Sequence, residues 1–112
     1  IDPNGLDQHE AGAKLDANKP CPAIVLGGFA TALQQVTLVG TFGAQKYSIG
    51  GWKHVDNGYQ RYQDAMMRHW LKHQSGEMID DESGLLHIAA IAWNALAVIE
   101  CYFMELDNRN AT

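Results

Sequence analysis

One stretch of this chain restricts its fold more than any other. Between Leu85 and Ile99 the only strongly polar side chains are His87 and Asn94. The apolar positions have helical spacing, and they surround the helix instead of forming one stripe. Such a helix must be buried on several sides. We therefore expect it to lie at the centre of an all-α fold.

A membrane-spanning helix is the competing interpretation of this stretch. We favour a buried helix because His87, Asn94 and Glu100 interrupt the run, and alanines replace much of the leucine and isoleucine of a typical span. Three helices of this length cannot cover such a helix alone. The sequence therefore predicts a homo-oligomer, a homodimer or homotetramer, and no membrane partner.

The composition narrows the possible functions. At 112 residues the chain is long enough for one domain, and 46% hydrophobic against 19% charged residues is typical of a globular protein. The net charge of −5 argues against a nucleic-acid partner, which requires a basic face. Cys21 and Cys101 lack zinc-site spacing, and we expect reduced thiols in a cytoplasmic protein.

Helical periodicity recurs along the chain, and no strand-like alternation persists. Glycines and an Asn-Gly turn signal at 48–58 separate the first two helical segments. We predict an all-α bundle of three main helices with an extended N-terminal arm, completed by oligomerisation. The expected helices are 24–47, 59–75 and 82–106, and the expected regions are an arm at 1–22, a helical domain at 23–107 and a tail at 108–112.

Four carboxylates fall within six positions just before the apolar helix: Glu77, Asp80, Asp81 and Glu82. On a helix, Glu77 and Asp80 share a face, and Asp80 begins a polar line that repeats every seven residues. Clustered carboxylates repel and raise one another's pKa unless a cation lies between them. A divalent metal at this cluster is one interpretation of the spacing. The alternative is that Asp80 to Ser83 caps the apolar helix.

Basic residues form two further groups. In the segment "RYQDAMMRH", Asp64 and Arg68 are i,i+4 neighbours, so an intrahelical ion pair is the plain explanation. Elsewhere, basic and aromatic residues in loops suit phosphate contact and stacking on a base. These are Lys14 and Lys19 around Asp16, then Lys46, Tyr47 and Trp52. No P-loop or dinucleotide fingerprint is present in the sequence.

Taken together, "GAKLDANKP", "TFGAQKYSIGGW", "DAMMRH" and "GEMIDDESGLLH" resemble motifs of the phage-type dATP/dGTP diphosphohydrolase family over residues 12 to 98. That family is regarded as related to the MazG-like all-α nucleoside triphosphate pyrophosphohydrolases. The resemblance implies hydrolysis of purine deoxynucleoside triphosphates (dATP, dGTP) between the α and β phosphates. It also implies Mg²⁺ or Mn²⁺ as cofactor, and a host cytoplasm for a phage-encoded protein. We expect a metal-activated water to attack the α-phosphorus, with one of the clustered carboxylates as general base.

The resemblance and the residue patterns together give three sets of candidate residues. The metal set is Glu77, Asp80, Glu82, Asp64 and His87. The catalytic set is Glu77, Asp80, Arg68 and His69. The substrate-binding set is Lys14, Asp16, Lys19, Lys46, Tyr47, Trp52 and Asn94.

The chain departs from the family pattern in two ways. Ala90 stands where the family often has a second histidine, one turn after His87, and the paired acids on the preceding helix are reduced to Asp64. Two alternatives therefore stay open. One is a non-catalytic helical interaction module with a capping acidic turn, and the other is an HD-type phosphohydrolase, although the contiguous His-Asp pair is absent.

Overall fold

The computed structural model describes residues 1–111, and its regular secondary structure is helical. No strand occurs among these residues; Ile79 and Leu86 form an isolated β-bridge. The expected all-α fold is therefore confirmed. The helices are α1 (Pro22–Gly27), α2 (Ala30–Lys46), the 3₁₀-helix η1 (Gly51–His54), α3 (Gly58–Gln74) and α4 (His87–Ala111). The chain divides into two compact units, Ile1–Ala30 and a second that begins at Thr31, and each is described by itself.

The first unit is closed around a buried carboxylate. Asp2 accepts hydrogen bonds from the backbone amides of Asn4 (2.6 Å) and Lys14 (3.0 Å), and the amide of Ala17 donates to the carbonyl of Ile1. Asp2 is 5% exposed, so its charge-assisted hydrogen bonds form inside the unit. The N-terminal arm thus folds back on itself before α1 begins.

The prediction of one continuous helix at 24–47 was wrong. The helix is interrupted after Gly27, and the amide of Phe29 donates to the carbonyl of Leu26 in a tight turn before α2 starts at Ala30. Two consecutive glycines explain the break, because glycine is the least favourable helix former after proline. The predicted helix at 59–75 is confirmed as α3. Gly76, with a positive φ of 100°, lies just after its end.

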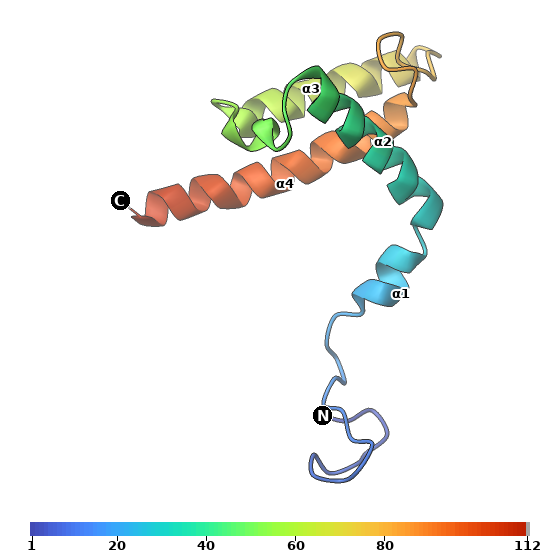
Figure 1. Ribbon diagram of the computed structural model, residues 1–112, viewed down its shortest axis with the longest axis vertical. Coiled ribbons are helices and arrows are strands. Elements are labelled where there is room, and N and C mark those ends of the chain that lie inside the picture. Colours follow the sequence, from blue (N-terminus) through green and yellow to red (C-terminus); the bar gives the residue numbers. More distant parts are fainter. Residues whose placement is uncertain (112) are drawn as a thin grey trace. The chain divides into compact units, whose positions relative to one another are not determined.

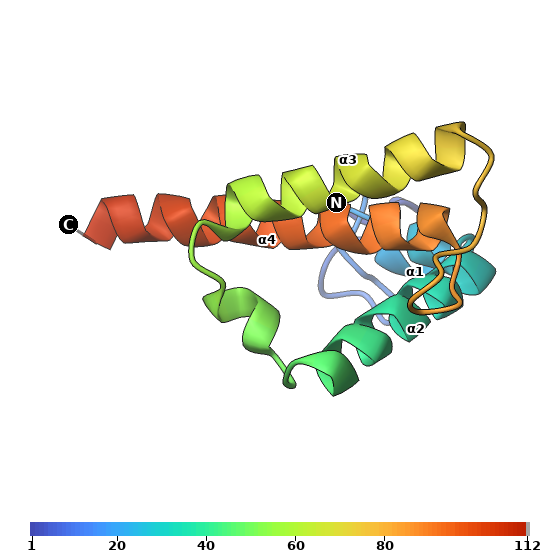
Figure 2. The ribbon, with the colours of Figure 1, turned by 90° about the horizontal axis from the view of Figure 1, so that it is seen from above.

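The second unit is organised by α3 and α4, which lie side by side and run antiparallel (Figures 1 and 2). The buried positions of α4 are mostly small: Ala89, Ala90, Ala97 and Cys101, with His87 and Asn94 as the buried polar residues. α2 approaches α4 at Gly40, where an added Cβ would lie 2.9 Å from Nε1 of Trp93. Small residues therefore allow close approach of the helices.

The start of the last helix was also predicted wrongly. α4 begins at His87 and not at 82, and it continues to Ala111, past the expected end at 106. Gly84 explains the later start, because its positive φ of 72° is incompatible with a helix. Glu77 and Asp80 consequently lie in a loop, and the expectation that they share a helical face was wrong.

Part of α4 remains uncovered. Five large apolar side chains are about half exposed, and we call them the open face: Ile88, Leu96, Ile99, Tyr102 and Phe103. By length and composition alone, α4 is also the one helix in residues 1–111 that is apolar enough to cross a bilayer. The core helix of a soluble protein meets the same criterion.

Candidate functional site

The loop between α3 and α4, residues 75–86, carries all four clustered carboxylates, and we call it the acidic loop. Backbone hydrogen bonds close it into a small hairpin. The amide of Asp80 donates to the carbonyl of Leu85 (2.8 Å), and the amide of His87 donates to the carbonyl of Met78 (3.0 Å). This closure brings Asp80 back toward the first turn of α4 and the last turns of α3.

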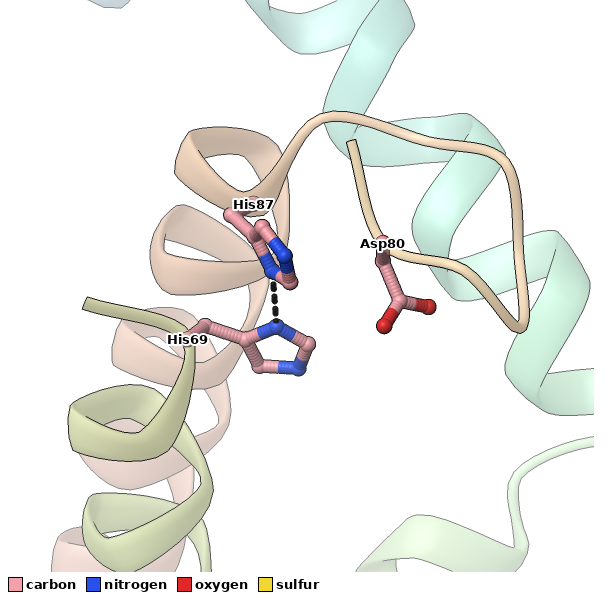
Figure 3. A group of neighbouring side chains, drawn as sticks. All are labelled: His69, Asp80 and His87. Atoms are coloured by element: carbon pink, nitrogen blue, oxygen red, sulfur yellow. Dashed lines mark hydrogen bonds between the residues drawn. The ribbon is translucent and has the colours of Figure 1, made fainter. Parts of the chain in front are cut away.

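Three side chains from different elements meet at this point: His69 from α3, Asp80 from the acidic loop and His87 from the first turn of α4 (Figure 3). One ligand atom of each lies within 4.8 Å of the others. The Nδ1 atoms of the two histidines are 2.8 Å apart. Two imidazoles and a carboxylate are a donor set that binds divalent metal ions in proteins. We call these three residues the His-Asp-His cluster.

Glu77 completes the surroundings of His87. Its Oε2 atom lies 2.5 Å from Nε2 of His87, whose side chain has no exposed surface. A buried imidazole needs partners for its polar atoms, and here Glu77 and His69 supply one each. Glu77 therefore contacts the cluster through His87.

Asp80 remains ionised in this environment. Partial burial works to raise the pKa of Asp80, but hydrogen bonds from the hydroxyl and amide of Ser83 outweigh it, helped by the neighbouring His69 and His87. The pKa of Asp80 therefore lies below its usual value. The expectation that clustered acids raise one another's pKa was wrong for this residue, because Ser83 and the histidines are closer influences than the other carboxylates.

His69 remains neutral more readily than a free histidine. Burial lowers its pKa, and the neighbouring His87 lowers it further, against the opposite influence of Asp80. Neutral imidazole is the form that offers a lone pair to a metal. The cluster thus combines an ionised carboxylate, Asp80, with one histidine, His69, whose lowered pKa favours the ligating form.

Glu82 lies outside the cluster and pairs with Lys46 at the end of α2. The hydrogen bond to Glu82 is the main cause that raises the pKa of Lys46, and the Tyr47 side chain adds to it. The ammonium group also lies 5.0 Å from the centre of the Tyr47 ring. Two candidate substrate residues and one candidate ligand therefore form an exposed group of their own.

Two candidates on α3 are exposed to solvent, Asp64 and Arg68. Asp64 accepts a hydrogen bond from Nε2 of Gln60 (3.2 Å). The alternative explanation of an Asp64–Arg68 ion pair is not borne out within residues 1–111. The guanidinium of Arg68 therefore remains accessible to a ligand on the outer side of α3.

In the second unit Trp52 is half-buried and Asn94 is buried. Trp52 packs edge-on against Trp93, with ring centres 5.9 Å apart, and its carbonyl accepts a hydrogen bond from the hydroxyl of Tyr62. Asn94 is 5% exposed and donates to the carbonyl of Ala90 (2.8 Å). Lys14, Asp16 and Lys19 belong to the first unit.

Comparison with protein families identifies the chain. Residues 9–109 match the family described as "dATP/dGTP diphosphohydrolase, N-terminal". The chain belongs to the dATP/dGTP diphosphohydrolase family. The match includes His69, Asp80 and His87, so the whole His-Asp-His cluster lies inside the family's N-terminal domain. Comparisons with curated proteins and with solved structures found no match.

Two features of this family member's site escaped the sequence reasoning. His69 was expected to act in catalysis, but its contact with His87 was not predicted, and Ser83 was considered only as a helix cap. Ser83 instead donates both its amide and its hydroxyl to Oδ2 of Asp80, at 2.9 and 2.8 Å. No signal in the sequence places His69 beside His87, because this contact depends on how α3 and α4 pack.

Proposed function

We propose that this domain hydrolyses dATP and dGTP between the α and β phosphates, releasing the deoxynucleoside monophosphate and pyrophosphate. Membership in the dATP/dGTP diphosphohydrolase family supports the substrate class. The observation that carries the proposal is the convergence of His69, Asp80 and His87, the last of them fully buried, at one end of the α3–α4 pair.

The cluster has the chemistry to hold a divalent cation such as Mg²⁺ or Mn²⁺. Asp80 supplies a charged oxygen and the two histidines supply nitrogen atoms. A bound cation would neutralise triphosphate charge and lower the pKa of a water molecule. Glu77 is hydrogen-bonded to Nε2 of His87. The carboxylates of the acidic loop are candidates for the general base that accepts the proton of the attacking water.

Exposed cations and rings supply candidate contacts to the rest of the nucleotide. Arg68 lies one position before His69 on α3, and Lys46 reaches the acidic loop through its pairing with Glu82. We assign phosphate contacts to both. Phosphate contacts by Lys14 and Lys19 stay a prediction from the sequence. Tyr47, which is 77% exposed, presents its ring for stacking on a base.

The open face of α4 supports association with a second copy of the chain. About half of each large side chain on this face is exposed, and exposed apolar surface of this kind marks interaction sites. A lipid bilayer is a less favourable environment for the open face than a second protein chain. Glu100, near the middle of α4, is exposed, and charged side chains are costly inside a membrane. We propose a homodimer or homotetramer in the cytoplasm, where the free thiols Cys21 and Cys101 stay reduced.

An assay that resolves the products tests the proposed reaction. The full chain is incubated with each of the four deoxynucleoside triphosphates and MnCl₂, MgCl₂ or CoCl₂, and pyrophosphate, phosphate and triphosphate are separated. Pyrophosphate from dATP and dGTP, abolished by EDTA and by Asp80→Asn, is the expected result. Inorganic triphosphate would indicate HD-type chemistry, and no product with any metal would favour the non-catalytic interaction module.

A further inference from the structure

The hydrogen bonds of His87 determine which of its two ring nitrogens can bind a metal ion. Nε2 lies 2.5 Å from Oε2 of Glu77, and an ionised carboxylate can only accept a hydrogen bond. In a neutral His87 ring, Nε2 therefore carries the proton and Nδ1 presents a lone pair. A carboxylate that holds the far nitrogen of a histidine in this way is the usual outer partner of a metal-binding histidine.

The lone pair of His87 points at a second imidazole nitrogen. Nδ1 of His69 is 2.8 Å away, so without a cation one proton must lie between two atoms that are both potential ligands. A cation would accept both lone pairs at once. Both hydrogen bonds from Ser83 end on Oδ2 of Asp80, which leaves Oδ1 as the oxygen available to the same ion.

We propose that the His-Asp-His cluster binds an imidazole-preferring transition metal ion in preference to Mg²⁺, and that Glu77 is a positioning residue for His87. Two of the three donors are imidazole nitrogens, whereas Mg²⁺ prefers oxygen ligands and retains several waters. The affinity of such a site rises from Mn²⁺ to Co²⁺. The role of this ion in hydrolysis rests on the proposed function, but its binding does not.

Calorimetric titration of the metal-free full chain with MgCl₂, MnCl₂ and CoCl₂ measures the preference directly. Co²⁺ is expected to bind most tightly and Mg²⁺ most weakly, with both transition ions lost in His69→Gln and His87→Gln. His54→Gln is the matched control, because His54 is an exposed histidine of η1 outside the cluster. Equal affinity for Mg²⁺ and Co²⁺, or binding that survives in both cluster variants, would overturn the proposal.

Glu77→Gln separates positioning from ligation and from folding. Loss of an outer partner weakens metal affinity by roughly 10–100-fold, and we expect Co²⁺ affinity to fall by that amount. Asp107→Asn, another carboxylate but exposed on α4 outside the cluster, should bind as the wild type does. Melting in EDTA shows whether each variant folds. Wild-type affinity in a folded Glu77→Gln variant would refute the positioning role.

Pulsed electron paramagnetic resonance of the Mn²⁺-bound protein identifies the donors independently of activity. Couplings to ¹⁴N from two imidazoles are expected, with one set removed by His69→Gln. Two outcomes distinguish this inference from the proposed function. Tight Co²⁺ binding with ¹⁴N couplings but no pyrophosphate release upholds the metal site and refutes the activity. Full Mg²⁺-dependent activity in His69→Gln and His87→Gln upholds the activity and overturns the metal site.

Discussion

The two ends of the α3–α4 pair differ in the residues that make their contacts: one end is polar and titratable, and the other is small and apolar. At one end, His69 and His87 meet nitrogen to nitrogen beside Asp80. At the other, Gly58 packs so closely on Cys101 that an added Cβ would lie 3.0 Å from the sulfur atom. Burial raises the pKa of that thiol, with smaller contributions from Glu105 and Glu100, and so keeps it in the neutral form.

We propose that this difference separates stability from function within one helix pair. Small apolar contacts at the Gly58 end gain dispersion and exclude water without any polar cost. A fully buried histidine at the other end is expensive unless each polar atom has a partner. Since the polar end is the one that gathers a charged carboxylate and potential ligands, we assign the chemistry to it and the anchoring of the helices to the Gly58 end.

The largest expected effect comes from the polar end. His87→Gln and Asp80→Asn should each lower pyrophosphate release by more than the roughly 100-fold that loss of an outer partner costs, because each removes a proposed direct ligand of the metal. Cys101→Ala, a change at the Gly58 end of the helix pair, should retain activity per folded molecule. Initial rates with dATP, normalised to the folded fraction, make the comparison. Equal losses at both ends would show that the two ends are not functionally distinct.

The sequence predicted α3 well because its apolar period ends at clear glycine and Asn-Gly signals. It failed at the start of α4, since Leu85 and Leu86 continue the apolar run although they belong to the hairpin of the acidic loop. Periodicity does not distinguish a short extended apolar segment from the first turn of a helix. The helix starts late because Gly84 has a positive φ, and the presence of a glycine in the sequence does not by itself predict that conformation.

The candidate site was predictable only in part for a related reason. Asp80 and His87 stand out as polar residues beside an apolar helix, so the sequence names them. The roles of His69 and Glu82 depend on which helices are neighbours. His69 reaches His87 through the α3–α4 packing, and Glu82 is drawn to Lys46 at the end of α2. Neither pairing follows from spacing along the chain.

The second-largest expected effect concerns the open face of α4, which belongs to neither end of the helix pair. Ile99→Glu places a charge in the open face, and we expect the oligomer to dissociate because a buried unpaired charge is strongly unfavourable. Light scattering at micromolar concentration measures the mass. Glu100→Gln, at the next position but outside the open face, is the control and should keep the wild-type mass. A monomeric wild type with the open face still exposed would contradict the association.

A smaller effect tests the Gly58 end. Gly58→Ala introduces a methyl carbon 3.0 Å from Sγ of Cys101, and we expect a loss of about 1 kcal/mol in the free energy of unfolding. The same change in a Cys101→Ala background should be neutral or stabilising, because the sulfur atom is gone and alanine favours helix. A double-mutant cycle of melting temperatures gives the coupling. Metal affinity should be unchanged in all three variants, which would confirm the independence of the two ends.

The smallest expected effect lies beside the polar end and decides the role of Glu82. If Glu82 is a partner of Lys46 only, Glu82→Gln leaves Co²⁺ affinity at the wild-type value, whereas Asp80→Asn abolishes binding. Freed from this carboxylate, Lys46 should contact the triphosphate more readily, so KM for dATP should fall slightly at low ionic strength and the difference should vanish in high salt. Lys46→Met should raise KM without changing metal affinity. A parallel loss of Co²⁺ binding in Glu82→Gln and Asp80→Asn would instead make Glu82 a ligand, as the sequence alone suggested, and would extend the metal site along the acidic loop.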